Sequence, residues 1–456
     1  MMQSFKEARV IAIIGRRTVS EPFRNLLVKT YPNLNNSCSY WPLLAYLLFP
    51  TRIDEGEIIV SRHAIAELLG YSSTPTNFNV RHIFEEFCKD IQPFTWSDYS
   101  KAEKRARTVE SLEFPKIIQD ALKKEHDKLL QREERVYLLT GKPFSKAKQY
   151  RSIVRQHNEA LKQTAKVKET KVLLDYMNSL PPTLFTKLIK TNGKATLEAI
   201  KNLELDSEHQ WNIFSSILDN PIQIYQPSDR TVRIFPVGER IVSLKSEIRR
   251  VLTKGMAEAD LKSAQFSIAA TLWDIPSVIE FLENGGDMWE YLYQLGTRNK
   301  AALKDILYSL MFGMHYFGIL KRLEAIGIKY RDFIALPLIK DLVKARNKEM
   351  KRIVKESGAT TCFGNFLKLE IEQDEKSILA QCCQAMELKL LFPIIDIAMT
   401  ARGRKGFAIA LWQHDGFTLH SYAAARRNYY KEKCSLLVEQ QAHELGIMTK
   451  LQWKDL

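Results

Sequence analysis

The sequence predicts a mostly helical fold that carries a small antiparallel β-sheet. Apolar residues recur at helical spacing through a long charged stretch at 99–179. Helical patterns also dominate from Leu244 onward, where two short segments, 256–260 and 407–420, have strand character instead. With 456 residues and 45% hydrophobic content, the chain is long enough for two or three domains with cores of their own.

The composition favours an anionic partner and a reducing compartment. The formal net charge is +14, which suits an anionic polymer or surface. The longest early apolar patch, 40–50, is far shorter than the roughly 20 residues that a membrane span needs. No signal-peptide pattern opens the sequence, so we expect a cytoplasmic protein without a membrane partner. Six cysteines lack any CxxC spacing and are expected to be buried free thiols: Cys38, Cys88, Cys362, Cys382, Cys383 and Cys434.

The first hundred residues predict a small α/β module. Residues 57–60 have strand character, Ser61 is placed to cap a helix that ends near Gly70, and a second helix is expected at 79–91. Two helices beside a strand suit a winged-helix-like unit, although paired amphipathic helices are common in many folds.

The stretch at 99–179 predicts two long antiparallel helices joined by a hairpin at Thr140–Pro143. A solvated surface and a phosphate-binding surface both fit its basic residues, which include Lys101, Lys104, Arg105, Arg107, Lys146, Lys148, Arg151 and Arg155. A further helix is expected at 183–203, followed by strand and turn character at 223–243.

Asp415 interrupts an apolar segment near the end of the chain. Residues 409–412 resemble a buried strand, polar residues follow from Gln413 to Gly416, and apolar residues resume at Phe417. The pattern predicts two strands joined by a turn that carries Asp415. Because a buried carboxylate is costly unless a cation pairs with it, we expect a cation at this turn.

A second carboxylate is expected beside Asp415, because Mg²⁺ sites usually combine one or two carboxylates with substrate phosphates. Asp260 ends the short strand at 256–260, and a helical pattern starts after it. Two such acids on one sheet suit a pair of Mg²⁺ ions about 4 Å apart, the arrangement used for in-line phosphoryl transfer.

Three segments resemble motifs A, B and C of the family A (DNA polymerase I-like) polymerases. The motif A segment opens at Asp260 and continues through Asp274, Ile275 and Pro276 to residues 281–287, with one residue more than the family spacing. Motif B is matched by Lys304, Tyr308, Phe312 and Gly313, and motif C by His414, Asp415 and Gly416. The motifs occur in the family's order, the two aspartates lie 155 positions apart (415 − 260), and the resemblance covers about residues 211–456.

This resemblance implies a divergent enzyme of viral or mobile-element type with a right-hand polymerase fold. Its implied parts are an N-terminal accessory module at 1–98, a thumb of long helices at 99–210, palm segments at 211–273 and 395–456, and fingers at 274–394. The N-terminal module matches no family that we recognise. We find no paired-acid DxE pattern that would indicate a proofreading exonuclease. The segment before the thumb is also short for such a domain.

The resemblance also implies a role for individual residues. Asp260, Asp415 and the backbone carbonyl of Leu261 would hold two Mg²⁺ ions, for which Mn²⁺ can substitute, and Lys304 would protonate the leaving pyrophosphate. The implied nucleotide-binding residues are Arg298, Lys300, Tyr308, Phe312 and Gln265, and the implied nucleic-acid-binding residues are His414, Arg230, Arg233, Arg249 and Arg250. From spacing alone, the two aromatic residues also fit a core stripe, and the arginines also fit a solvated surface.

Several positions depart from the family pattern. Gln265 stands where the family usually has a glutamate that excludes ribose, and Phe312 lacks the hydroxyl that partners this glutamate. Gly416 replaces the glutamate of motif C, Gln413 replaces an apolar residue, and Lys300 replaces an arginine. We therefore expect relaxed sugar selection, and with it the ability to start chains as a primase does.

Alternatives from other classes remain open. The phage-type single-subunit RNA polymerases share this palm and its aspartates. The Ser-Cys-Ser-Gly-like run of their motif A is missing here, and their motif B usually lacks an aromatic residue at the place of Tyr308, which favours DNA synthesis. The segment 414–417, however, is slightly closer to their motif C. A non-catalytic DNA-binding replication protein is the second class, and a metal-dependent nuclease a distant third. Expected partners are a DNA primer-template or single-stranded DNA, nucleoside triphosphates, and a small accessory protein or helicase that no residue identifies.

Overall fold

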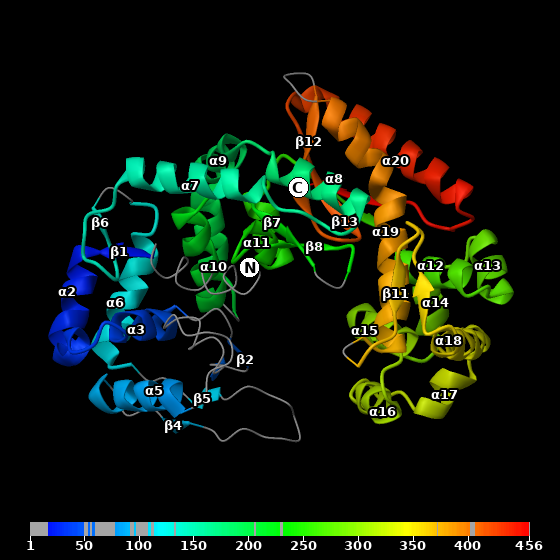
Figure 1. The fold of residues 1–456 in the computed structure, drawn as a ribbon, viewed down its shortest axis with the longest axis horizontal. Coiled ribbons are helices and arrows are strands. Elements are labelled where there is room, and N and C mark those ends of the chain that lie inside the picture. Colours follow the sequence, from blue (N-terminus) through cyan, green and yellow to red (C-terminus); the bar gives the residue numbers. More distant parts are fainter. Residues whose placement is uncertain are drawn as a thin grey trace. The chain divides into compact units, whose positions relative to one another are not determined.

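The computed structural model describes twelve stretches of the chain (Figure 1). These are residues 17–49, 53–54, 57–59, 78–91, 95–96, 108–110, 114–131, 134–204, 207–228, 231–371, 373–401 and 406–455. The contacts divide the chain into two compact units, each of which is described by itself. The first comprises Met1–Leu161, Leu180–Ile224 and Pro236–Lys254, and the second comprises Lys162–Ser179, Tyr225–Phe235 and Gly255–Leu456.

Within its described residues, the first unit is helical with two small antiparallel sheets. Its helices are α2 (Glu21–Thr30), α3 (Tyr40–Leu48), α5 (Phe78–Ile91), α6 (Lys116–Asp127), α7 (Lys146–Ala160), α9 (Pro182–Lys201), α10 (Ser207–Asp219) and α11 (Ser246–Leu252), with short 3₁₀ turns η1 (Pro32–Asn35) and η2 (Ile241–Ser243). Strands β1 (Thr18–Ser20) and β6 (Arg135–Tyr137) form one sheet. The other has the order β2-β3-β5-β4, from Ile53–Asp54, Glu57–Ile59, Thr108–Glu110 and Thr95–Trp96.

The structure confirms the strand near 57–60 and the helices near 79–91 and 183–203 as β3, α5 and α9. The helix expected from Ser61 to Gly70 lies outside the described residues, so the winged-helix hypothesis stays a prediction.

The expectation of two long helices at 99–179 is wrong. The described part of this stretch contains β5, α6, β6, α7 and α8 (Lys168–Asn178), and α8 belongs to the second unit. Strand β6 pairs with β1, and its first residue, Arg135, is buried with Nη1 3.5 Å from Oε2 of Glu125. These two interactions account for a strand at this position. The predicted turn at Thr140–Pro143 is present, but it follows a strand: Gly141 has φ +66°, and the Tyr137 amide donates to the Lys142 carbonyl. The basic residues from Lys146 to Arg155 lie on α7, whereas those from Lys101 to Arg107 are outside the described residues.

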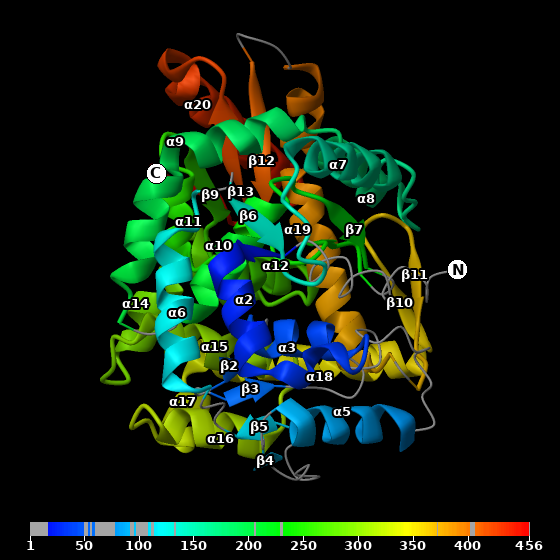
Figure 2. The same cartoon turned by 90° about the vertical axis from the view of Figure 1, so that its left-hand side faces the viewer.

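The second unit is built around a four-stranded antiparallel sheet with the order β12-β13-β9-β14. Figure 2 labels β9, β12 and β13 of this sheet. Its strands are β9 (Ala257–Leu261), β12 (Phe407–Trp412), β13 (Gly416–Ser421) and β14 (Leu451–Asp455), which confirms the strands expected at 256–260 and 407–420. The β12 residues are all buried. Because β12 is an edge strand, its amides need partners, and the hydroxyls of Tyr176 and Tyr225 accept from Ile409 and Trp412 at 2.9 and 3.0 Å.

Helices make up most of the rest of this unit. After β9 come α12 (Ala264–Leu272), α13 (Pro276–Glu283), α14 (Met288–Tyr293), α15 (Lys300–Met311), α16 (Tyr316–Glu324), α17 (Tyr330–Ala335), α18 (Pro337–Lys355), α19 (Glu375–Thr400), the 3₁₀ turn η3 (Ala424–Arg426) and α20 (Arg427–Glu444). Two short hairpins pair β7 (Tyr225–Pro227) with β8 (Ile234–Pro236) and β10 (Gly358–Thr360) with β11 (Phe366–Lys368). The predicted strand and turn character at 223–243 is thereby confirmed.

Helix α19 is a core helix of the second unit. Within the described residues it is the one helix long and apolar enough to meet a membrane-span criterion, yet 67% of its apolar window is buried inside the protein. It packs against α12, α18 and α20 and contains the buried charged residue Glu387. All six cysteines are free, as expected, but the expectation that all are buried is wrong: Cys38 is exposed, and Cys362 and Cys382 are half-buried.

Candidate active site

Asp260 lies at the end of a central strand. Strand β9 pairs with β13 on one side and β14 on the other, which fixes the backbone of Asp260 between two neighbours. The strand ends where Ser263 adopts a left-handed conformation with φ 51°, and α12 begins at Ala264. The Asp260 side chain is 32% exposed, so it is accessible at the edge of the sheet.

Asp415 lies in the tight turn of the β12–β13 hairpin. The Gln413 amide donates to the Gly416 carbonyl at 2.9 Å, and His414 has φ 71°, a conformation that a tight turn requires. The Leu261 amide donates to the Asp415 carbonyl at 2.9 Å, and Gly416 lies directly opposite Asp260 in the sheet register. The two aspartates, 155 positions apart in the sequence, are therefore neighbours across adjacent strands.

The electrostatics of this pair favour a bound cation. Burial raises the pKa of Asp415, the nearby Asp260 carboxylate raises it further, and the positive charge of Lys304 lowers it in part. Lys454, on β14, donates to Asp260 Oδ2 at 2.7 Å, and its Nζ lies 3.9 Å from Oε1 of the buried Glu258. The ammonium group of Lys454 thus already pairs with Asp260, one of the two aspartates.

The donor set suits a divalent metal such as Mg²⁺, because carboxylate oxygens are the hard ligands that this ion prefers. The mutual repulsion of Asp260 and Asp415 is the observation that supports this fit. Within the stretches that the structure describes, no group of three or more histidine, cysteine or acidic residues is placed to hold a metal, so the fit rests on two carboxylates.

Gly416 is the residue of this site whose identity the backbone geometry explains most directly. A Cβ built at position 416 would lie 2.4 Å from the Ala259 carbonyl oxygen and 2.4 Å from Asp260 Oδ1. Because one of these atoms belongs to the backbone, the strands would have to separate. The motif C glutamate of the family therefore does not fit the observed spacing of β9 and β13.

Gly416→Ala is expected to lower the free energy of unfolding of the second unit by about 1–3 kcal/mol, the usual penalty for forcing extra volume into a packed site. Denaturant melts of the two proteins would measure this. Gly193→Ala in α9 is the control, because its Cβ would meet only ordinary contacts at 3.7 Å. That variant should instead gain about 0.5–1 kcal/mol of helix stability. A Gly416→Ala protein as stable as wild type would contradict the close approach of the two strands.

Helix α15 carries the residues of the predicted motif B. Asn299 caps its N-terminus, and residues spaced by four place Lys300, Lys304 and Tyr308 on one side of the helix. Lys304 and Tyr308 line an open depression of about 810 Å³, together with Phe312, Gly313, His315 and Lys376. The Lys304 Nζ lies 5.5 Å from the centre of the Tyr308 ring. Burial raises the pKa of Tyr308, and the negative charges of Asp415 and Glu387 raise it further.

The other two basic residues near α15 are placed differently. Lys300 lies with its Nζ 5.5 Å from the centre of the Trp289 ring, a cation–π contact, and Arg298 is exposed just before the helix. Their roles toward a nucleotide stay predictions.

Gln265 is buried and bound to a residue that the sequence analysis did not identify. It lies in the first turn of α12, five residues after Asp260, and its Nε2 donates to Glu387 on α19. Arg233 Nη2 donates to the other oxygen of Glu387 at 2.6 Å. The signal in the sequence was an acidic residue inside the apolar run of α19, a pattern that can mark a buried, paired charge, but Asp396 in the same run is exposed.

His414 and the predicted DNA-binding arginines have mixed placements. The His414 ring lies 5.0 Å from that of Phe235, and burial lowers the pKa of His414 to about 4, with a further contribution from the charge of Arg233. Its imidazole is thus neutral at pH 7. Arg249 and Arg250 lie on α11 of the first unit, where Arg249 Nη1 donates to the Leu244 carbonyl, and Arg230 lies outside the described residues.

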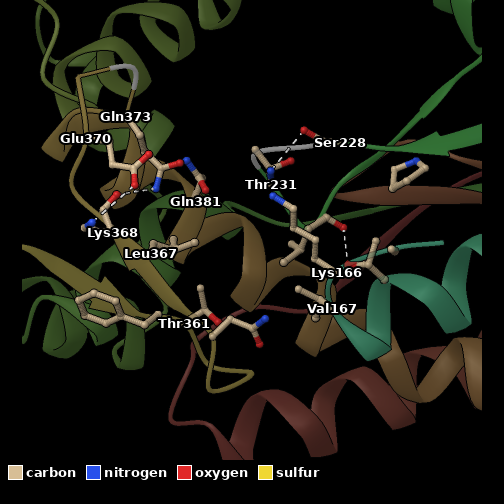
Figure 3. Close-up of a pocket in the computed structure, with 16 residues that line it drawn as sticks. Lys166, Val167, Ser228, Thr231, Thr361, Leu367, Lys368, Glu370, Gln373 and Gln381 are labelled. Carbon is tan, nitrogen blue, oxygen red and sulfur yellow. Dashed lines mark hydrogen bonds and ion pairs between the residues drawn. The ribbon is translucent and has the colours of Figure 1, made fainter. Parts of the chain in front are cut away.

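A second pocket, of about 220 Å³, lies elsewhere in the second unit. Gln373 and Gln381 reach toward it from one side, and Lys166 and Thr231 from the other (Figure 3). The Oε1 atom of the buried Gln381 has no hydrogen-bond partner within the described residues. The sequence analysis identified none of these four residues.

Comparisons with known proteins add little to these observations. No protein-family model matches the chain, and no curated protein matches it. Among solved structures the chain is similar to the POL domain of Pol1 from M. smegmatis, in a complex with DNA primer-template and dNTP. The identity is 12%, the match covers 91% of this chain and 80% of that chain, and the TM-score is 0.41. At this level of similarity no functional conclusion follows, and the function proposed below rests on the residues of the site.

Proposed function

We propose that the chain is a template-directed DNA polymerase of the family A type. The observation that carries this proposal is the juxtaposition of Asp260, near the end of β9, and Asp415, in the turn that leads into the neighbouring strand β13, with Lys304 near enough to lower the pKa of Asp415. Two neighbouring carboxylates and a lysine beside an open depression suit nucleotidyl transfer, in which positioning and charge neutralisation supply most of the catalysis.

In the proposed reaction, the 3′-oxygen of a primer forms a bond to the α-phosphorus of a nucleoside triphosphate while the bond to pyrophosphate breaks. When bound, two divalent ions would supply charge neutralisation and make the 3′-hydroxyl easier to deprotonate, and its proton passes to water. Asp260, Asp415 and the backbone carbonyl of Leu261 are the groups that would hold these ions. Lys304 orients the triphosphate and gives a proton to the leaving pyrophosphate.

Two aromatic residues of the depression and several residues outside it bind and select the nucleotide in this proposal. Tyr308 and Phe312 border the sugar and the templating base, and Gln265 occupies the position that contacts the sugar. His414, which is neutral at pH 7, supports the primer terminus. Lys300, Arg298 and the arginines at 230, 233, 249 and 250 complete the proposed contacts with phosphates.

The proposal extends to domains and partners. The palm comprises 211–273 and 395–456, the fingers 274–394 and the thumb 99–210, with an accessory module at 1–98. The substrates are DNA and nucleoside triphosphates, the location is the cytoplasm, and the source is a replicon of viral or mobile-element type. A small accessory protein or a helicase is a further proposed partner.

A single-subunit RNA polymerase or primase of the same superfamily is the second candidate. The observation that favours it is the altered sugar gate: Gln265 is buried and bound to Glu387, and Phe312 has no hydroxyl. Extension assays with Mg²⁺ on a single-stranded template, with and without an annealed primer, would separate the candidates when dNTPs and rNTPs are supplied separately. Primer extension with dNTPs supports the DNA polymerase, and products from rNTPs without a primer support the primase. Strong rejection of rNTPs at equal concentration would contradict relaxed sugar selection.

Lys454→Met is expected to tighten metal binding. The variant removes the cation that donates to Asp260 Oδ2 and so removes a competitor for this oxygen. Exposed ion pairs contribute up to about 1 kcal/mol, which corresponds to about a fivefold lower Kd for Mn²⁺. Titration with Mn²⁺, followed by electron paramagnetic resonance without DNA or nucleotide, would measure it.

The matched control for this titration is Lys450→Met, which removes an exposed lysine just before β14. Its Kd for Mn²⁺ should equal that of wild type. An unchanged or higher Kd in Lys454→Met would show that Asp260 is not a metal ligand.

A further inference from the structure

Strand β14 places a lysine beside two acids of strand β9. Lys454 lies directly opposite Glu258 in the register of the two strands, whereas Gln452 lies opposite Asp260. Side chains directly opposite each other are closer than diagonal neighbours. The ammonium group nevertheless lies on the diagonal partner: Nζ donates to Asp260 Oδ2 at 2.7 Å and is 3.9 Å from Oε1 of Glu258. The side chain of Lys454 is therefore drawn along the sheet, toward the end of β9.

Glu258 is the more buried of the two acids that share this ammonium group. Its side chain is 3% exposed, compared with 32% for Asp260 and 42% for Lys454. The two acids are separated by one residue on the same strand, so their side chains lie on the same face of the sheet. A buried carboxylate is costly unless a cation pairs with it. Glu258 therefore competes with Asp260 for the charge of Lys454.

The neighbouring turn explains why Asp260 holds the ammonium group in the metal-free protein. Gly416 lies opposite Asp260, and Asp415 directly precedes it, so Asp260 has a second carboxylate beside it. Two negative charges attract a cation more strongly than one, because Coulomb energies add. A divalent ion between the two aspartates would reverse this balance. It would neutralise both of them and repel the ammonium group of Lys454 at short range.

We propose that Lys454 and Glu258 exchange a counter-ion for the metal: when a divalent ion binds Asp260, the ammonium group moves from Asp260 to Glu258. This inference rests on the proposed function, because the metal site is part of it. The move is short, since the distance of 3.9 Å between Nζ and Glu258 Oε1 is about 1 Å longer than a hydrogen bond. Both acids thus keep a positively charged partner with and without metal. Lys454 and Glu258 are positioning residues, because they act through Asp260.

Crystal structures of the protein with and without Mn²⁺ test the exchange directly. Anomalous scattering shows whether Mn²⁺ occupies the site between the two aspartates. In the structure with Mn²⁺ we expect the Lys454 Nζ within about 3.2 Å of a Glu258 carboxylate oxygen and beyond hydrogen-bond distance of Asp260. A structure in which Mn²⁺ is bound and Lys454 still donates to Asp260 would overturn the inference.

Metal affinity supplies a second readout. Glu258→Gln removes the acid to which the ammonium group moves, with almost no change in volume. The Kd for Mn²⁺, measured by electron paramagnetic resonance without DNA or nucleotide, should rise about fivefold, the effect of one ion pair. In a Lys454→Met background the same substitution should change the Kd by less than about twofold, because no ammonium group is left to move. Glu439→Gln, at an exposed position on α20, is the matched control and should bind Mn²⁺ as wild type does.

The outcomes separate this inference from the proposed function. An unchanged Kd in Glu258→Gln, or an equal rise with and without Lys454, would show that no exchange takes place, while the metal site itself stands. If wild type binds no Mn²⁺ between Asp260 and Asp415, the proposed metal site fails and the exchange fails with it.

Discussion

Asp415→Asn is expected to abolish nucleotide incorporation while leaving DNA binding intact. The substitution keeps the size of the side chain but removes a charge that a divalent ion needs as a ligand. Losing such a ligand should lower the incorporation rate by at least about 10³-fold. Rapid-quench assays on a primer-template would measure the rate, and fluorescence anisotropy with the same DNA would measure binding, which should change less than about twofold.

Stability distinguishes this result from misfolding. Asp415 is a half-buried charge whose pKa is raised by burial and by Asp260, so its neutralisation should leave the unfolding temperature equal or higher. Asp396→Asn, at an exposed position on α19, is the matched control and should retain full activity. An active Asp415→Asn enzyme would rule out the proposed metal site, and the binding-protein alternative requires that wild type and variant be equally inactive.

Lys304→Met is expected to have the second largest effect. Methionine preserves most of the unbranched stem beside the Tyr308 ring but removes the ammonium group, which lies 5.5 Å from the ring centre. Loss of one group that stabilises charge in the transition state lowers kcat by about 10²–10³-fold. Single-turnover incorporation at saturating dNTP would show this loss, because weaker nucleotide binding alone disappears at saturation.

Two comparisons test the Lys304 result. Lys340→Met removes an exposed lysine from α18 and should behave as wild type. Lys304→Arg keeps the charge and should recover part of the rate, although the guanidinium is a poor proton donor to pyrophosphate because it stays protonated. A Lys304→Met enzyme with normal kcat and raised KM would assign Lys304 to binding rather than to the chemical step.

The local sequence predicted the elements of the site well. The alternation of an apolar strand, a polar turn and a second strand located Asp415, and the change from strand to helix located Asp260. Both are short-range patterns, which is why they identify local structure reliably. Helical spacing likewise placed Lys304 and Tyr308 on one side of α15.

The sequence did not predict the features that depend on contacts between distant segments. The segment that forms strand β6 was expected to be helical from its local pattern. It is a strand because its pairing with β1 and the burial of Arg135 beside Glu125 override that local preference. The contacts of Lys454 and the close approach at Gly416 depend on the position of β9 between β13 and β14. The contact of Glu387 with Gln265 depends on the packing of α19 against α12. Partners that lie more than 100 residues apart leave no periodic signal in a single sequence.

Primer extension by the purified protein with Mg²⁺ and dNTPs, assayed beside Asp260→Asn and Asp415→Asn, tests the proposed polymerase function. We expect template-dependent extension by wild type, its loss when EDTA removes the metal, and no extension by either variant. Extension that persists in both aspartate variants, or its absence in wild type on every primer-template and with every nucleotide, would show that the protein is not a polymerase that uses these two aspartates.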